Sequence, residues 1–170
     1  PQKLVGVGFS AQGTFVGSYY KRTKASFHSK FNWIFDGISD EFLGNFGLSG
    51  GGAAGFELDR ADTQLGTPRN AVILATSEGH SRDYTSDANN FFVLVPEEHL
   101  THISTWPGEE IDTLIRSDIV FYSNDYGGAV FSVGSITFCG SLPINNYNNN
   151  ISKMLNNVIK NFVDPKFNLP

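Results

Sequence analysis

The residues best suited to chemistry follow a run of small residues near the middle of the chain. Positions 50–54 read GGGAA, and four charged residues come soon after: Glu57, Asp59, Arg60 and Asp62. A carboxylate can orient an imidazole or relay a proton, and it is costly to bury unpaired. Because glycine loses the most backbone entropy on folding, three in a row indicate positive φ angles or close backbone approach. The pattern fits an acid carried to a buried site, or an exposed flexible loop with scattered charges.

A second acid and an imidazole follow the apolar segment AVILAT at 71–76. Its nearly continuous apolar character predicts an interior strand covered on both faces. Glu78 and His80 come directly after it, and ligands collect at the carboxyl ends of strands in open α/β sheets. With a spacing of two residues, both side chains share one side if the strand continues. The other reading is a loop in which the acid and the imidazole satisfy backbone groups.

Three further groups of residues suggest chemistry less strongly. His99 and His102 have helical spacing, but ligand spacing without a supporting cluster is weak support for a zinc site. Cys139 follows the apolar residues ITF, so we predict an inert, buried thiol rather than a nucleophile. The adjacent Tyr19 and Tyr20 are expected to pack, not to bind a metal.

The elements that must position these residues have recognisable patterns. The segment 31–38 (FNWIFDGI) alternates aromatic and aliphatic residues and predicts a strand. Segments 119–122 and 129–138 flank the turn SNDYGG and predict a hairpin. Residues 150–162 keep the helical rhythm of one buried stripe: Ile151, Met154, Leu155, Val158, Ile159 and Phe162. An asparagine at 148–150 is expected to cap this helix, which Asp164–Pro165 should end.

Length and composition indicate one folded domain over residues 1–170. The chain is 40% hydrophobic and 14% aromatic, which is enough to build a core. A net charge of −5 without a basic block argues against a nucleic-acid partner. No apolar run is long enough to cross a membrane, and a single cysteine is compatible with a reducing compartment, so we expect a cytoplasmic location. Pro1 in place of Met suggests that the chain begins inside a longer product.

Several motifs, taken in order, carry a resemblance to a known family. They are LVGVGFSAQG, SYYKRT, WIFDGI, GGGAAGFELDRAD, LGTP, the S-x-G-H after AVILAT, GGAVFSVGS, CGSL and NNISKMLNNVIKNF. Together they resemble the carboxyl-terminal part of the large (beta) subunit of N,N-dimethylformamidase and its relatives. The likeness extends over nearly the whole chain and is strongest in the glycine-acid stretch and the GGAVFSVGS hairpin.

The resemblance implies an amide hydrolase that splits N,N-dimethylformamide, or a similar small amide, into an amine and formate. The implied fold is α/β, a class I glutamine-amidotransferase-like (flavodoxin-like) sandwich with a β-hairpin and a terminal amphipathic helix. The family uses a mononuclear iron held by two tyrosines and a glutamate, with a histidine and a second glutamate as catalytic partners. A small companion subunit and further large-subunit copies are the implied protein partners.

Only part of this machinery is expected in the present chain. The iron ligands and the catalytic histidine are placed upstream of Pro1, so the chain is expected to be incomplete and inactive alone. The second glutamate matches Glu57 as the catalytic candidate, with Glu78 as the other choice and His80 as a possible site-lining residue. Ile144–Asn145 departs from the His-Asn pair of the family, which allows a different substrate. The alternative function is a non-catalytic glutamine-amidotransferase-like module that binds a small ligand or another subunit.

Overall fold

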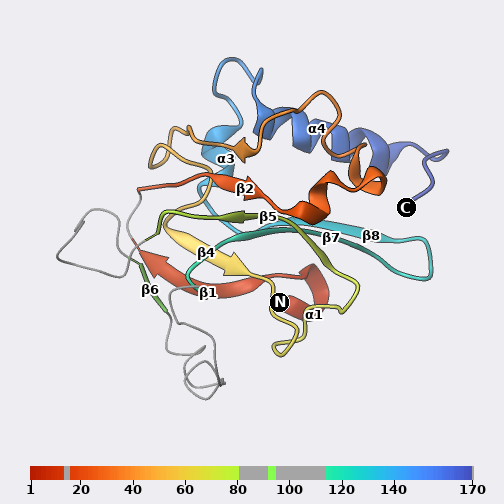
Figure 1. The fold of residues 1–170 in the computed structure, drawn as a ribbon, viewed down its shortest axis with the longest axis horizontal. Helices are drawn as coiled ribbons and strands as arrows, with labels where there is room; N and C mark the ends of the chain where they lie inside the picture. The colour runs from red at the N-terminus through yellow and green to blue at the C-terminus, as the bar shows by residue number, and fades with distance from the viewer. Residues whose placement is uncertain (14–15, 81–91, 95–113, 170) are drawn as a thin grey trace.

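The chain folds into two antiparallel sheets and one long helix arranged in layers. The computed structural model describes residues 1–13, 16–80, 92–94 and 114–169, with only the backbone described for 92–94. Figure 1 shows the helix α4 (Asn150–Val163) across one side of the larger sheet and the smaller sheet on the other side. Apolar residues from all three layers join one buried cluster, which includes Ala11, Leu58, Leu74 and Met154.

The larger sheet has five strands, and all its neighbouring pairs are antiparallel. Its order is β3 (Phe42–Leu43), β2 (Tyr20–Arg22), β5 (Val72–Ser77), β7 (Asp118–Ser123) and β8 (Ala129–Val133). The strand predicted at 71–76 is therefore confirmed as an interior strand, because β5 pairs with a neighbour on each side. Tyr20, the first residue of β2, is completely buried.

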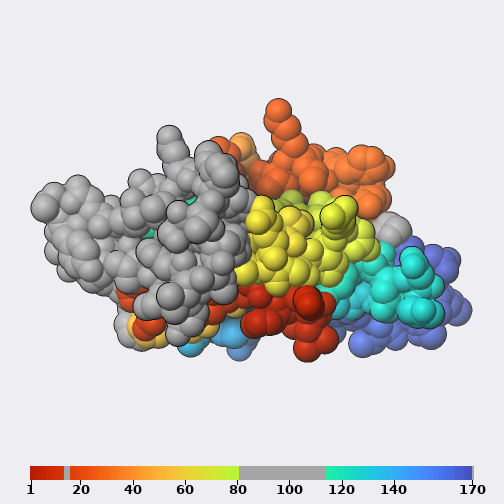
Figure 2. Space-filling view, turned by 90° about the horizontal axis from the view of Figure 1, so that it is seen from below, coloured from red at the N-terminus to blue at the C-terminus, as the bar shows by residue number. Residues whose placement is uncertain are grey.

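The smaller sheet has the order β4 (Glu57–Arg60), β1 (Gly8–Gly13) and β6 (Phe92–Leu94). Its strands are also antiparallel. The short helix α1 (Gln2–Val5) precedes β1. Figure 2 shows the amino-terminal residues beside residues of the 60–70 region, where the Thr67 hydroxyl donates to the Gly6 carbonyl at 2.8 Å.

The hairpin and the terminal helix are both confirmed, with one difference at the end of the hairpin. β7 and β8 pair in register from Ile119–Val133 to Ser123–Ala129, and Gly127 has the positive φ expected for its turn. The second strand was predicted to reach residue 138, but β8 ends at Val133. The chain turns there because the Gly134 carbonyl accepts a hydrogen bond from the Asp59 amide in β4, and Phe138 opens the short helix α3 (Phe138–Ser141).

Helix α4 begins and ends as predicted, but its apolar stripe is only partly buried. The Asn149 side chain accepts from the Ser152 amide and caps the helix, and Asp164 follows its last residue. Ile151, Met154 and Val158 are in the core. Ile159 is 52% exposed and Phe162 is 42% exposed, so the end of the stripe lies on the surface.

The strand predicted over 31–38 is wrong. Two 3-10 helices, η1 (Lys24–Phe27) and η2 (Ser29–Phe31), lead into this region. The chain then continues through turns, with Gly37 at a φ of 68°. Phe31, Ile34, Phe35 and Ile38 are buried. Their spacing of three, four and seven residues is that of a helical backbone, whereas a strand would bury alternate residues.

Cys139 was predicted to be buried and is instead exposed. The prediction assumed that the strand continued through 136–138. In the structure Cys139 lies in α3, where Phe138 and Ser141 face inward and the thiol faces out.

The α/β class is confirmed, with mostly antiparallel sheets and few helices. The pairs that a flavodoxin-like sandwich requires are parallel, and each described pair is antiparallel. In the part of the chain that the structure describes, no helix is both long and apolar enough to span a membrane.

Candidate functional site

The glycine run packs directly against the backbone of a second segment. We call this contact of residues 17–18 with 50–55 the glycine crossing. The amides of Gly17 and Ser18 donate to the carbonyls of Gly50 and Ala54, both at 2.7 Å. A Cβ atom added to Gly52 would lie 2.5 Å from the Ser18 carbonyl oxygen, so only glycine fits. Gly50 and Gly51 have positive φ angles, which confirms both features predicted for the run.

The start of β4 is fixed on the far side of this crossing. Phe56 has a φ of 62°, an uncommon conformation for an aromatic residue. Its carbonyl accepts from the Gly13 amide at 2.9 Å, and the Ser135 hydroxyl bonds to both the amide and the carbonyl of Gly55. Strain of this kind persists only where the surroundings enforce it, so the position of Glu57 is closely defined.

Glu57 is half-buried and lies opposite Gln12 in β1. Its amide donates to the Gly55 carbonyl at 2.7 Å. Within the described ranges, no hydrogen bond or ion pair engages its carboxylate. A carboxylate held in place by its backbone alone can still accept a proton or bind a donor from another segment.

Asp59 lies two residues further along β4 and shares the side of the strand occupied by Glu57. Its Oδ1 atom is buried and has no hydrogen-bond partner among the residues that the structure describes. Burial, with the charge of Glu57 as a second cause, raises the pKa of Asp59 to about 6. Asp59 therefore holds a proton at higher pH than an ordinary aspartate.

The other two charged residues of the stretch pair with each other. Arg60 and Asp62 are almost completely buried, and their Nη2 and Oδ2 atoms are 2.8 Å apart. The same Asp62 carboxylate accepts from the amides of Gln64 and Leu65, which closes the following turn. The pair is structural, and the Glu57 carboxylate takes no part in it.

Glu78 lies at the same end of the molecule but in a more exposed setting. The strand β5 stops at Ser77, and Gly79 has a φ of 83°, so the alternation needed to bring Glu78 and His80 to one side is broken. The Glu78 carboxylate is 3.6 Å from Lys21 Nζ in a half-exposed ion pair. Its carbonyl accepts from the Ser18 hydroxyl, which ties the end of β5 to the glycine crossing.

His80 is half-buried beside a row of hydroxyl groups. Its Nε2 atom is 2.7 Å from Ser77 Oγ, which accepts at 2.8 Å from the Ser117 amide. Ser117 Oγ is 2.6 Å from the hydroxyl of Tyr20, whose burial raises its pKa. A hydroxyl can donate one hydrogen bond and accept two, so either Ser77 Oγ or His80 Nε2 can be the donor, depending on the tautomer of the imidazole. Burial lowers the pKa of His80 to about 4, so the imidazole is neutral near pH 7.

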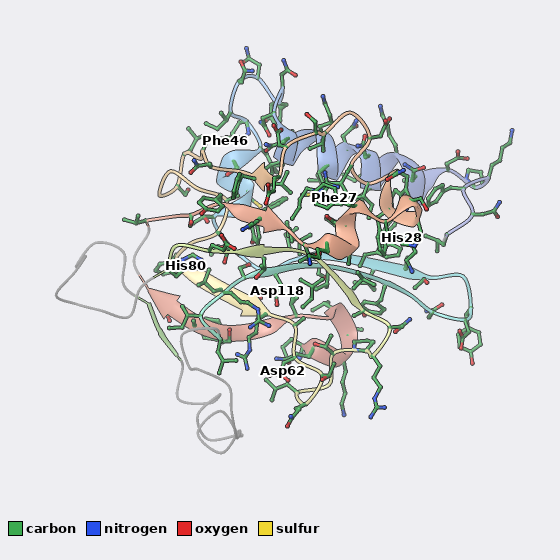
Figure 3. The ribbon with its side chains drawn as sticks, viewed as in Figure 1. Phe27, His28, Phe46, Asp62, His80 and Asp118 are labelled. Atoms are coloured by element: carbon green, nitrogen blue, oxygen red, sulfur yellow. The ribbon has the colours of Figure 1, made fainter. Side chains whose placement is uncertain are left out.

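Figure 3 shows His80 at the end of the molecule where β5 finishes and β4 begins. The glycine crossing, the start of β4 and the end of β5 therefore bring Glu57, Glu78 and His80 into one region. At the level of the sequence, Asp59 was named only as one of the charged residues after the glycine run, and Ser77 was given no role. The two-residue spacing of Glu57 and Asp59 in a strand pattern was the available signal for Asp59, whereas nothing in the sequence marks Ser77 as the neighbour of His80.

The residues that the structure describes contain no group of three or more His, Cys, Asp or Glu side chains able to hold a metal. They therefore do not fit an iron site by themselves. The histidines proposed for a zinc site, His99 and His102, lie outside the described residues.

The fold and these residues define an α/β protein with a polar region at one end of layered antiparallel sheets. Residues 1–150 match the family described as "N,N-dimethylformamidase beta subunit-like, C-terminal", and the chain belongs to that family. It is 41% identical over 163 residues to the N,N-dimethylformamidase beta subunit of Paracoccus aminophilus, and 39% identical over 163 residues to that of an Alcaligenes species. Each match covers 95% of this chain and 20% of the relative, so the chain spans about a fifth of their length.

Proposed function

We propose that the chain is the carboxyl-terminal part of the large subunit of an amide hydrolase. The enzyme would split the C–N bond of N,N-dimethylformamide, or of a similar small amide, into an amine and formate. Membership of the family and the names of the two relatives support this proposal. In keeping with a large-subunit role, we propose a small companion subunit and further large-subunit copies as partners, in the cytoplasm.

Amide hydrolysis needs a polarised carbonyl and a proton for the leaving nitrogen. A mononuclear iron, held by residues outside this chain, would act as the Lewis acid when bound. Because the described residues supply no ligand cluster, the roles that we assign to them are limited to positioning and proton transfer. The glutamine-amidotransferase-like sandwich is likewise a proposal for the whole subunit, and its parallel strands would come from outside the described pairs.

Glu57 is the residue to which we assign the proton step. The observation that carries this assignment is its half-buried carboxylate, held by the glycine crossing with no donor bound to it among the described residues. Such a group can orient a histidine from another segment or pass a proton to the amine. Asp59 favours this role because its raised pKa keeps a second negative charge from building up beside Glu57 at mildly acidic pH. Glu78 is less suitable because Lys21 pairs with it near the surface.

The test is Glu57→Gln in the intact enzyme, with Glu78→Gln as the matched control. We expect amine release by Glu57→Gln to fall by about a hundredfold or more, because an amide cannot accept or relay a proton. Iron content and melting temperature should stay near those of the unsubstituted enzyme. If Glu57→Gln keeps full activity while Glu78→Gln abolishes it, the site belongs to the loop after β5.

A subunit-interaction module is the second candidate, and the outer face of α4 favours it. A groove of about 460 Å³ runs along this face, lined by Leu142, Leu155 and Ile159 among others. The intact mass and the iron content of the natural protein distinguish the two functions. A long polypeptide with iron supports the enzyme, whereas a free-standing 18.6 kDa chain without metal supports the module.

A further inference from the structure

Arg22, the last residue of β2, is a buried cation at the wall of a cavity. The residue is only 8% exposed. The cavity has a volume of about 670 Å³, and its lining includes Arg22, Phe27, Asn32, Phe35, Asp36 and Ile38. Figure 3 shows Phe27 on the α4 side of the larger sheet and well separated from His80, so this cavity is distinct from the candidate site above.

The Arg22 guanidinium is held rigidly. Its central carbon lies 3.9 Å from the ring centroid of Phe27 and 3.8 Å from that of Phe35. Nε donates to Ser26 Oγ at 3.1 Å, and Nη2 donates to the Ser26 carbonyl at the same distance. Nη1 donates more weakly to the Ile38 carbonyl at 3.4 Å. Stacking and hydrogen bonds together fix both the plane and the rotation of the group.

The charge of Arg22 is not balanced inside the described part of the chain. A guanidinium has five N–H donors, and the three bonds above leave one N–H on each terminal nitrogen. No carboxylate of the described residues forms an ion pair with it, and Asp36, which lines the same cavity, is no exception. Burial lowers the pKa of Arg22, and among the described residues no acidic neighbour offsets that effect. A buried charge of this kind calls for a counter-charge from another source.

We propose that this cavity binds a carboxylate, with Arg22 as its anchoring cation. The two terminal nitrogens of a guanidinium match the two oxygens of a carboxylate, so a bidentate pair adds a fixed geometry to the attraction between the charges. Asp36 at the same cavity disfavours a dianion, so a singly charged carboxylate fits better than a phosphate. The rings of Phe27 and Phe35 give the remainder of the ligand an apolar contact. A free organic acid or an acidic side chain of another segment carries this chemistry.

Binding can be measured on the intact subunit with benzoate as the probe and benzyl alcohol as its uncharged analogue. We expect benzoate to bind and to raise the melting temperature, with little effect of benzyl alcohol or inorganic phosphate at the same ionic strength. Arg22→Lys keeps the charge but loses the planar fork, so affinity for benzoate should fall about tenfold or more. Lys24→Gln, which removes a nearby exposed charge, should bind as the unsubstituted subunit does.

A second variant and a structure complete the test. Phe27→Leu removes an exposed ring from one side of the guanidinium and leaves its hydrogen bonds, so it should weaken benzoate severalfold without unfolding the chain. If benzoate does not bind, an Asp or Glu side chain on the Arg22 nitrogens in a structure of the intact subunit identifies the protein as the source. Finding neither ligand nor side chain there overturns the proposal. Equal affinity of benzoate for Arg22→Lys, or tighter binding of phosphate, also overturns it.

Discussion

The glycine crossing and the inner face of α4 both bring two segments of the chain into close contact, but they do so with different groups. At the crossing, two stretches of backbone touch and side chains are excluded, which frees the following strand to hold Glu57 in a defined place. Under α4, apolar side chains such as Ile151 and Met154 fill the space between the helix and the sheet. Two backbones in contact cannot make room for an added atom, whereas side chains can change their rotamers. The two regions should therefore respond differently to substitutions of the same size.

The sharpest test of this difference is one methyl group at the crossing. Gly52→Ala places a Cβ 2.5 Å from the Ser18 carbonyl oxygen, and its other nearest atoms, in Gly17 and Ser18, are also backbone atoms that cannot move away by a rotamer change. We expect the subunit to lose about 4 kcal/mol or more of its free energy of unfolding, measured with urea. Gly51→Ala is the control, since its Cβ meets nothing within 4 Å. It should cost about 1 kcal/mol from its positive φ alone. Equal losses in the two variants would contradict the rigid crossing.

Removing side-chain bulk under α4 should have the next largest effect. Met154 is completely buried, so Met154→Ala should cost about 3 kcal/mol through lost burial and the cavity left behind. Ile159→Ala on the exposed side of the same helix should cost less than about 1 kcal/mol. Urea unfolding of both variants measures the difference. A cost for Ile159→Ala as large as that for Met154→Ala would mean that another surface covers the exposed face.

The polar region adds a pH dependence that the helix region lacks. With a pKa of about 6, the folded Asp59 keeps a proton that the unfolded chain loses near its ordinary value of 3.8, so its contribution to stability is lost as the pH rises through 6. With a pKa lowered to about 4, the folded His80 stays neutral while the unfolded chain takes up a proton near 6.5, so stability is lost as the pH falls. The two effects oppose each other between about pH 4 and pH 6.

Single substitutions should separate these two effects. Asp59→Asn should steepen the loss of stability on acidification, and His80→Gln should flatten it. Each changes the slope by at most about 1.4 kcal/mol per pH unit, the value for one proton. Urea midpoints measured from pH 4 to pH 7 give the slopes. Parallel curves for the three proteins would show that neither group is buried in the intact subunit.

The smallest effect is expected at Cys139, on the exposed side of the short helix α3. Cys139 should react with a maleimide in the folded protein, because its side chain is exposed. Cys139→Ala should change the free energy of unfolding by less than about 0.5 kcal/mol, as is usual for a surface position. A thiol that reacts only after denaturation would show that Cys139 is buried in the folded protein.

The features predicted well from the sequence were those that depend on local periodicity. AVILAT, the β7–β8 hairpin and α4 all carry regular apolar patterns with turn or cap residues at their ends, and each was found, although β8 ends at Val133 and not at 138. The region 31–38 failed because its aromatic residues fit two periods. Its buried positions are spaced by three, four and seven residues, and this spacing is typical of a helical or turn conformation rather than a strand.

The polar region was predictable in its residues but not in its contacts. The glycine run pointed to close backbone approach, but the sequence could not show that residues 17–18 would be its partner. Asp59 and Arg22 acquire their properties from burial, Asp59 beside another charge and Arg22 between the rings of Phe27 and Phe35. Pairing across long stretches of chain depends on tertiary packing, on which a local pattern has no bearing.

The connectivity of the larger sheet also constrains the order in which the protein can form. Tyr20 in β2 pairs with Ser77 in β5, and Ile73 in β5 pairs with Val120 in β7. During synthesis, β2 can pair early with β3, but it must wait for more than fifty residues before β5 exists, and β5 must wait about as long again for β7. Folding dominated by such distant contacts is slow, because each loop must close before its contacts form. On the ribosome, β5 would keep one edge without its partner until β7 emerges, an interval in which a chaperone can bind that uncovered edge.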